Sequence, residues 1–248
     1  MTEYAGRKAV ITGGTAGIGL AVAEAVVAGG GEVVVTGRRA ADRARFGDRG
    51  LVVRSDSADL GQIEELAAVV EQRLGRVDLL FVNAGFAQPG PFGRVTEELF
   101  DATFGVNAKG AFFTAQRLAP LVVDGGAIVF TTSVANGAGN PGMTPYAGAK
   151  AAVRAFTKGI AAELLPRGIR VNAVSPGFIE TPSGGITDAD PELLRRFAQA
   201  GDAITPMRRH GSVAEVARAV LFLAFGATFT TGAEFNVDGG LGLRLTRP

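Results

Sequence analysis

The 248-residue sequence contains no cysteine and no tryptophan, and its only histidine is His210. Without cysteine there can be no disulfide and no thiolate metal site. One histidine cannot form a histidine-based metal cage. No Gly-x-Ser-x-Gly segment is present, so a hydrolase nucleophile has no local support. We therefore predict no metal site, and the absence of cysteine fits a reducing compartment.

Excess charge and long hydrophobic runs are also missing. The 25 basic and 24 acidic residues give a formal net charge of +1, so no field attracts nucleic acid or an anionic membrane. The longest apolar run, Ala219–Phe225, is far shorter than the ~20 residues of a membrane span. The first eight residues lack the apolar stretch of a secretory signal. We expect a cytoplasmic protein that binds neither nucleic acid nor membrane.

What the sequence does contain is an alternation of short β-branched runs with longer helical patterns. Hydrophobic residues make up 47% and charged residues 20%, as in a globular chain of one domain. Strands are expected near 8–12, 32–36, 51–54, 78–82, 127–132, 170–174 and 234–237. Helices are expected near 18–28, 59–74, 96–107, 111–122, 145–165, 191–200 and 213–225. This alternation predicts an α/β fold, a doubly wound, seven-stranded parallel sheet with helices on both faces, within one domain at 1–248.

Several helix starts carry capping signals. Asp59-x-x-Gln62 and Ser212-x-x-Glu215 are predicted to be capping boxes, and Asp190 precedes a proline at a first helical position. The least regular segment, 177–209, is rich in glycine and proline and holds one short helix. We expect it to be a lid over a ligand crevice, with a plain surface insertion as the alternative.

The segment from Val10 to Gly19 reads V-I-T-G-G-T-A-G-I-G. A β-branched strand, then glycines, then a helical pattern is typical of a turn that aims backbone N–H groups and a helix N-terminus at a phosphate. Gly13 permits the tight turn, and Gly17 and Gly19 permit close backbone approach and helix packing. The sequence predicts a phosphate-binding turn, and a purely structural glycine turn is the alternative.

Tyr146 and Lys150 are four residues apart, and Ser133 lies thirteen residues upstream of the tyrosine. Residues at this spacing share one face of a helix. A cation at ~4 Å from a phenolate, at an effective dielectric of ~20, stabilises it by about 4 kcal/mol. That is about three pKa units at most, and desolvation opposes it. We predict a tyrosine whose pKa is moved down toward physiological pH, so that it exchanges protons with an alcohol or a ketone. The same spacing also occurs on helices without catalytic groups.

Taken together, these features resemble the short-chain dehydrogenase/reductase family. The motifs occur in the family's order and spacing from about residue 6 to the glycine-rich end near residue 240. They are Thr12-Gly13-x-x-x-Gly17-Ile18-Gly19, Asn83-Ala84-Gly85, Asn107, Ser133, Tyr146, Lys150 and Pro176-Gly177. The resemblance implies a Rossmann fold, a nicotinamide dinucleotide cofactor, and oxidation or reduction at a CH–OH or C=O group.

The resemblance also implies catalytic roles. In the reduction direction, Ser133 would hydrogen-bond the carbonyl oxygen and Tyr146 would donate the proton while hydride reaches the carbonyl carbon. Lys150 would tune Tyr146 and bind the nicotinamide ribose. Asn107 would hold a water in the proton relay to Lys150, and a helix-kink residue bonded only to backbone is its alternative.

Cofactor preference is predicted from the end of the second strand. An NAD-binding turn normally carries an acid about 20 residues after the glycine motif, on the ribose 2′-hydroxyl. The corresponding residue here is Gly37. A missing carboxylate removes repulsion against a 2′-phosphate, and Arg38 and Arg39 could pair with it; two solvated arginines are the alternative. We predict that NADP(H) is preferred and that NAD(H) is possible.

The resemblance places further residues around the dinucleotide. Asp56 and Ser57 would hold the adenine edge, and the Asn83–Gly85 segment would lie against the adenosine. The backbone of Ile179 and the hydroxyl of Thr181 would bind the carboxamide or the phosphates. The full predicted cofactor set is Gly13, Thr15, Gly17, Ile18, Gly19, Arg38, Arg39, Asp56, Ser57, Asn83, Ala84, Gly85, Tyr146, Lys150, Pro176, Gly177, Ile179 and Thr181.

The substrate is predicted from apolar residues beside the motifs, namely Phe86, Ala135, Met143, Phe178 and Ile186, together with Ser133 and Tyr146. They favour an uncharged, fairly apolar ketone or secondary alcohol, unless they only close the core. Three other functions stay open: an NAD-dependent alcohol dehydrogenase of the same family, a non-catalytic dinucleotide-binding sensor or scaffold, and a non-redox enzyme, such as an epimerase, that uses the nicotinamide transiently.

A homotetramer is predicted from the resemblance and from the small residues Ala147-Gly148-Ala149 and Ala151-Ala152, which suit close helix contact. Similar proteins are mostly homotetramers that pack the helices near 111–122 and 145–165 against symmetry mates. The segment Gly239–Leu245 could join a second interface.

Overall fold

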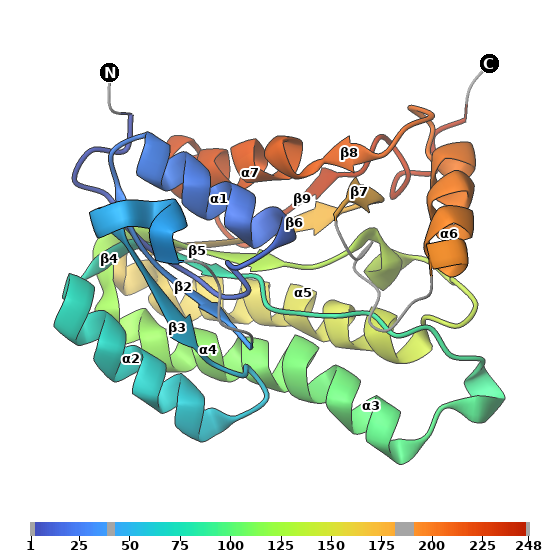
Figure 1. Ribbon diagram of the computed structural model, residues 1–248, viewed down its shortest axis with the longest axis horizontal. Helices are drawn as coiled ribbons and strands as arrows, with labels where there is room; N and C mark the ends of the chain where they lie inside the picture. Colours follow the sequence, from blue (N-terminus) through green and yellow to red (C-terminus); the bar gives the residue numbers. More distant parts are fainter. Residues whose placement is uncertain (1–2, 39–42, 182–190, 247–248) are drawn as a thin grey trace.

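The computed structural model describes residues 3–38, 43–181 and 191–246. Its centre is a seven-stranded parallel sheet in the order β3-β2-β1-β4-β5-β6-β9 (Figure 1). The strands are β1 (Lys8–Ile11), β2 (Glu32–Gly37), β3 (Gly50–Arg54), β4 (Val77–Val82), β5 (Val122–Thr131), β6 (Arg170–Pro176) and β9 (Glu234–Val237). The strand order reverses between β1 and β4, and ligands of such sheets bind outside the carboxyl ends of the strands at this point.

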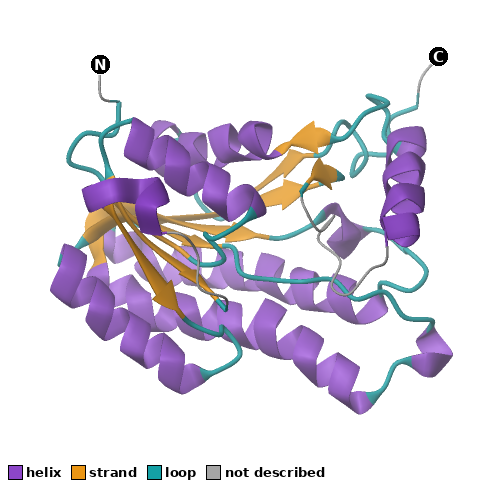
Figure 2. Cartoon of the chain, in the orientation of Figure 1, coloured by secondary structure: helices purple, strands orange, loops and turns teal. Residues whose placement is uncertain are grey.

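Helices cover both faces of the sheet (Figure 2). They are α1 (Gly17–Ala28), α2 (Leu60–Leu74), α3 (Glu97–Phe104), α4 (Ala111–Leu118), α5 (Thr144–Leu164), α6 (Pro191–Ile204) and α7 (Val213–Leu221). One core layer combines α1 and α7 with one face of the sheet, and the other combines α2, α4 and α5 with the opposite face. The predicted doubly wound α/β fold is therefore confirmed.

The strands read as apolar runs because they are buried on both sides. In β1, Ala9 and Ile11 pack into the layer with α1 and α7, whereas Val10 packs into the layer with α2 and α4. β2 repeats this alternation with Val33 and Val34 on opposite faces. Period-2 alternation of side chains thus distributes one continuous apolar run between two cores.

The structure differs from the predicted elements at three places. The expected helices at 96–107 and 111–122 are joined by a π-helical turn, η3 (Gly105–Gly110). A Cβ on Gly110 would lie 2.9 Å from the carbonyl carbon of Ser57, so this glycine permits close packing and does not end the helix. The helical chain ends at Leu121, and β5 begins at Val122. A two-stranded ladder of β7 (Ile179–Glu180) and β8 (Gly211–Ser212) was not predicted, because two-residue strands have no readable period.

Short helical turns complete the chain. They are η1 (Arg43–Arg49), η2 (Phe92–Arg94), η4 (Ala119–Leu121), η5 (Val134–Gly137), η6 (Leu165–Arg167) and the π-helical turn η7 (Phe222–Gly226) that extends α7.

The capping predictions are met in part. The Ser212–Glu215 capping box is present in full. Asp59 accepts from the backbone N–H groups of Gly61 and Gln62 at 2.9 and 3.2 Å. The Gln62 side-chain oxygen accepts from the backbone N–H of Asp56 and not from that of Asp59, and its Nε2 donates to the Asp59 carboxylate at 2.8 Å. Asp190 lies outside the described residues. In the described ranges, no helix has the length and apolarity needed to cross a membrane.

Candidate active site

The predicted motifs meet at the carboxyl ends of four neighbouring strands. The glycine turn follows β1, the Asn83–Gly85 segment follows β4, Ser133 follows β5, and Pro176 ends β6. Tyr146 and Lys150 lie in the first turns of α5, which packs beneath the sheet (Figure 1). The fold therefore brings segments from distant parts of the sequence to one edge of the sheet.

The glycine turn and the segment after β4 form one hydrogen-bonded unit. The Thr12 hydroxyl accepts from the backbone N–H groups of Asn83 and Ala84 at 2.9 and 3.1 Å. The Asn83 amide donates back to the carbonyls of Thr12 and Gly13 at 3.2 and 3.3 Å. Gly13 has a φ of 63°, a left-handed conformation that favours glycine. A Cβ on Gly19 would lie 2.7 Å from the Asn83 amide nitrogen, so a larger residue there would open the turn.

The N-terminus of α1 fits an anionic group. No side chain among the described residues caps its first turn, which also has no acidic residue. Thr181 faces this turn, because a Cβ on Gly17 would lie 3.5 Å from the Thr181 methyl group. The Thr181 hydroxyl is buried without a hydrogen-bond partner in the described part of the chain. A buried hydroxyl and free helix N–H groups are hydrogen-bonding groups of the kind that phosphate or amide groups of a dinucleotide can satisfy.

Gly37 has a packing reason to lack a side chain. A Cβ at this position would lie 2.7 Å from the Thr15 methyl carbon, so the two residues are in close contact. Arg38 follows and is exposed. Arg39 lies outside the described residues. The end of β2 thus presents a cation and no carboxylate beside the glycine turn.

Asp56 and Ser57 follow β3 at the same edge of the sheet. One oxygen of Asp56 accepts from the backbone N–H of Ala58 at 3.0 Å, which forms a local turn. Ser57 is buried against the π-helical turn at Gly110.

Lys150 is a buried cation beside a tyrosine. Its side chain is 4% exposed, and Nζ donates to the carbonyl oxygen of Thr131 at 2.9 Å. Nζ lies 5.7 Å from the centre of the Tyr146 ring, so the two groups lie side by side as predicted. Burial lowers the pKa of Lys150 to about 8.

The predicted acidification of Tyr146 is wrong for the protein without a bound dinucleotide. Burial raises the pKa of Tyr146 above its ordinary value, and a hydrogen bond with the Ser133 hydroxyl opposes this only in part. The physical reason is that desolvation disfavours the charged form of both members of the pair. The spacing of Tyr146 and Lys150 correctly predicted that they are neighbours, but it contained no information about how deeply the fold buries them.

The Ser133 side chain is held by the backbone two residues further along the chain. It caps the short η5 helix, and its Oγ accepts from the backbone N–H of Ala135 at 3.2 Å. This contact fixes the hydroxyl at the end of β5.

Asn107 occupies the π-helical turn and is fully buried. Its amide donates to the carbonyls of Phe86 and Thr103 at 2.9 and 3.0 Å, and its oxygen accepts from the Phe86 N–H at 3.3 Å. A Cβ on Gly85 would lie 2.6 Å from Asn107 Oδ1 and 3.2 Å from Lys150 Nζ, so Gly85 permits their approach. π-helical turns are frequent at functional sites. The recorded bonds of Asn107 go to backbone, in line with the kink interpretation.

The proposed substrate-lining residues have different environments. Ala135 is buried, whereas Phe86, Met143 and Phe178 are partly buried. The Phe178 ring packs edge-on against His210 at 5.5 Å. Ile186 lies outside the described residues.

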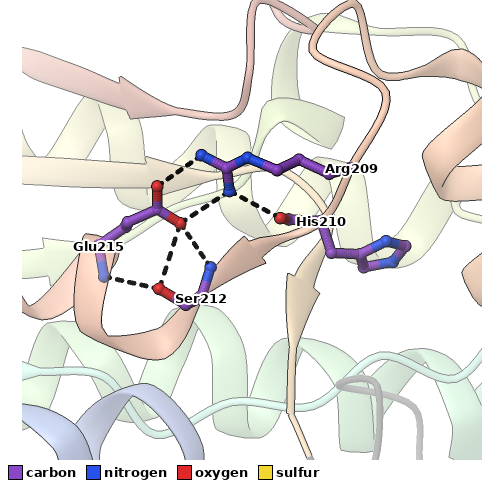
Figure 3. Close-up of polar contacts among 4 residues, drawn as sticks. All are labelled: Arg209, His210, Ser212 and Glu215. Atoms are coloured by element: carbon purple, nitrogen blue, oxygen red, sulfur yellow. Dashed lines mark hydrogen bonds and ion pairs between the residues drawn. The ribbon is translucent and has the colours of Figure 1, made fainter.

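An ion-pair network of Arg209, His210, Ser212 and Glu215 was not predicted (Figure 3). Arg209 pairs with both oxygens of Glu215 at 2.7 and 3.0 Å and donates to the His210 carbonyl at 2.9 Å. Glu215 also accepts from the Ser212 N–H at 2.7 Å. The hydrogen bond from Arg209 is the main reason that the pKa of Glu215 is lowered to about 2. The network fixes β8 to the start of α7, and β8 pairs with β7, which leads into Thr181. The capping box was its only sequence signal.

Comparisons with known proteins agree with this geometry. A family model described as enoyl-(acyl carrier protein) reductase matches residues 13–242. The 3-oxoacyl-[acyl-carrier-protein] reductase FabG of Thermotoga maritima is 39% identical over 247 residues, covering 95% of this chain and 98% of that protein. The 3-oxoacyl-[acyl-carrier-protein] reductase MabA of Mycobacterium tuberculosis is 35% identical over 244 residues, covering 97% and 94%.

Solved structures give the same result. A short-chain dehydrogenase/reductase from Brucella melitensis, titled a glucose/ribitol dehydrogenase, superposes with a TM-score of 0.87 at 31% identity, covering 96% of this chain and 98% of that one. A levodione reductase superposes with a TM-score of 0.86 at 27% identity, covering 97% and 99%.

Proposed function

The chain belongs to the short-chain dehydrogenase/reductase family, oxidoreductases that act on CH–OH or C=O groups, and from this we propose that it is an NADPH-dependent ketoreductase. It would reduce a ketone to a secondary alcohol or catalyse the reverse reaction. The observation that carries the proposal is the approach of Lys150 to the Tyr146 ring, together with the hydrogen bond between the hydroxyl groups of Ser133 and Tyr146. A protein that only bound a dinucleotide would not need this group of side chains.

The proposed cofactor is supported by the glycine turn and its neighbours. The N-terminus of α1, the Thr181 hydroxyl and the Asn83–Gly85 segment would hold the dinucleotide. Arg38 would pair with a 2′-phosphate, and Gly37, which packs against Thr15, brings no carboxylate to repel it. When bound, NADPH supplies the hydride. NAD(H) is the alternative cofactor. The other residues of the predicted cofactor-binding set are proposed to have the roles that the family resemblance implies.

In the proposed mechanism, Tyr146 is the acid and Ser133 positions the carbonyl oxygen. The raised pKa keeps the phenol protonated at neutral pH, which is the form that a proton donor needs. Lys150 is mostly protonated at pH 7, because its pKa is about 8. Its charge stabilises the phenolate that remains after the proton has left. Asn107 would hold a water near Lys150 by a rearrangement of its backbone bonds.

The substrate is proposed to be an uncharged, fairly apolar ketone. Phe86, Met143 and Phe178 are apolar and partly accessible beside the site. The names of the FabG and MabA relatives suggest a more specific candidate, a 3-oxoacyl thioester on acyl carrier protein, which presents such a ketone. The segment 177–209 is proposed to act as a lid, and its residues 182–190 lie outside the described structure.

A homotetramer is the proposed assembly. A groove of about 380 Å³ between α4 and α5 is lined by Phe112, Ala115, Ile160 and Leu164. These are the helices expected to pack against symmetry mates, and Gly239–Leu245 is the second candidate interface. Light scattering at low concentration would measure the subunit count, and a monomer would contradict this assembly.

The activity is tested with a panel of ketones and 3-oxoacyl thioesters, each assayed with NADPH and with NADH. We expect NADPH oxidation with at least one apolar ketone, and its loss in Tyr146→Phe. No oxidation by any member would contradict the activity, and a tenfold NADH preference in kcat/KM would make the chain an NAD-dependent dehydrogenase. Reduction of phosphorylated or carboxylated ketones alone would contradict the apolar substrate. Tight dinucleotide binding without turnover would favour the sensor or scaffold alternative.

A further inference from the structure

Glu234 begins β9, the strand at one edge of the sheet, and its Cα pairs with Ala173 of β6. The backbone just before it is fixed by the fully buried Asn172. The Asn172 amide donates to the carbonyl of Thr230 at 2.8 Å, and its oxygen accepts from the N–H of Ala233 at 3.1 Å. Glu234 therefore extends from a rigid base on the sheet.

The two carboxylate oxygens of Glu234 hold two different elements. One oxygen accepts from the Asn136 amide at 2.6 Å, and the other pairs with Arg154 Nε at 3.0 Å. Asn136 lies in η5, and its N–H donates to the carbonyl of Ser133 at 3.0 Å. Arg154 lies one turn after Lys150 on α5. One element carries Ser133, and the other carries Tyr146 and Lys150.

We propose that Glu234 is a positioning residue that sets the separation of Ser133 from Tyr146 by joining η5 and α5 to the same edge strand. The proposal rests on the proposed ketoreductase function. Ser133 and Tyr146 must reach one carbonyl oxygen together, although they come from separate elements. A misplacement of about 1 Å costs up to roughly 10²-fold in rate, so a contact that fixes both elements acts on turnover without touching substrate.

The chain offers a matched control on β4, the central strand of the sheet. Asp78 lies near the start of β4; its side chain is 17% exposed, against 13% for Glu234. It pairs with Arg7 at 2.6 Å and accepts from the N–H of Lys8 at 2.9 Å. Both carboxylates thus make one ion pair with an exposed arginine and one further hydrogen bond. Asp78 lies at the amino ends of β1 and β4, away from the candidate site.

The experiment compares Glu234→Ala, Glu234→Gln, Asn136→Ala and the Glu234→Ala/Asn136→Ala double variant with Asp78→Ala. We expect Glu234→Ala to lower kcat roughly tenfold, with the Kd for NADPH changed less than twofold. The double variant should lose little more, because both changes remove the same link. Glu234→Gln should recover part of kcat, because its oxygen still accepts from Asn136. Asp78→Ala should lower Tm by a similar amount and leave kcat within twofold.

Equal losses of kcat in Glu234→Ala and Asp78→Ala, or additive losses in the double variant, would overturn the positioning role. If Glu234→Ala does not fold, Glu234→Gln and Asn136→Ala carry the same comparison against Asp78→Ala.

A readout without substrate separates this inference from the proposed function. Amide hydrogen exchange of the free protein should accelerate at 134–138 and 146–154 in Glu234→Ala, but not in Asp78→Ala. If the wild type reduces no ketone, the proposed function fails and the exchange data still test the link. Unchanged exchange in both segments would overturn the positioning role of Glu234.

Discussion

Tyr146 and Lys150 lead to a prediction about the order in which the two groups lose their protons. Burial lowers the pKa of Lys150 to about 8 and raises that of Tyr146 above 10.0. Lys150 Nζ lies 5.7 Å from the centre of the Tyr146 ring. A charge at about this distance, with an effective dielectric of ~20, would stabilise the phenolate by about 3 kcal/mol, or about two pKa units. Above pH 10, however, only about 1% of a lysine with a pKa near 8 is charged. The cation is therefore gone before the phenol titrates.

The absence of tryptophan makes this measurable by tyrosine absorbance. The chain has two tyrosines, and burial also raises the pKa of Tyr4, so Tyr4→Phe is needed to leave a single signal. In that background, the phenolate absorbance of the dinucleotide-free protein should appear with a midpoint above pH 10. Adding Lys150→Met should move the midpoint by less than about half a unit, since the lysine is already neutral there.

Circular dichroism at each pH would confirm that the fold persists through the titration. A phenolate midpoint between pH 7 and 8 that rises in the Lys150→Met variant would refute the reasoning. It would show that the attraction between the two groups exceeds the desolvation that separates them.

Other predictions concern single residues. Tyr146→Phe should lower turnover by orders of magnitude with an unchanged circular dichroism spectrum, and near-wild-type turnover would remove the mechanism. Arg38→Ala should raise KM for NADPH roughly tenfold without changing KM for NADH, because it removes one charge-assisted hydrogen bond to the 2′-phosphate. Equal changes of both KM values would show that Arg38 does not contact the 2′-phosphate. Gly85→Ala should lower kcat, because its Cβ would lie 2.6 Å from Asn107 Oδ1; unchanged kinetics would show that the turn relaxes freely. The pKa of Glu215 is lowered to about 2, so its stabilising effect is present above its ordinary pKa near 4.5 and is lost as pH falls toward 2. Glu215→Gln should therefore have a lower Tm than wild type at pH 7, with a difference that narrows below pH 4.5; a constant difference would contradict the linkage.

Elements buried on both faces could be predicted from the sequence, because their pattern is local. Val10 and Val34 lie in the core beneath the sheet and Ile11 in the core above it, so each strand is an unbroken apolar run between polar or glycine boundaries. The ladder of β7 and β8 is different, because it depends on the pairing of Ile179 with Gly211, and β8 is fixed to α7 by the neighbouring Arg209–Glu215 pair. Nothing in two residues of sequence indicates such a partner.

The candidate site also combines features that the sequence could predict with features that it could not. The spacing of Tyr146 and Lys150 is a property of one helix, so the sequence predicted their proximity. The direction of the Tyr146 pKa shift depends on how deeply the fold buries Tyr146 and Lys150. The spacing of two residues on a helix does not determine that burial. Glu234 is a further case, because it meets Asn136 across 98 residues of chain. Its chemistry is ordinary for a strand at a sheet edge, and only the folded arrangement gives it two elements to join.

Local and long-range contacts therefore have different tasks in this protein. The groups proposed to exchange protons are encoded by short motifs, which fix residue type and spacing. Their relative placement depends on residues without a motif: Gly85, which lets Asn107 and Lys150 approach, and Glu234, which ties Ser133 and α5 to one strand. A second chain could keep every motif and still differ in rate if the residues at 85 or 234 changed, because the chemistry requires the groups to be present and also to be held at the correct separation.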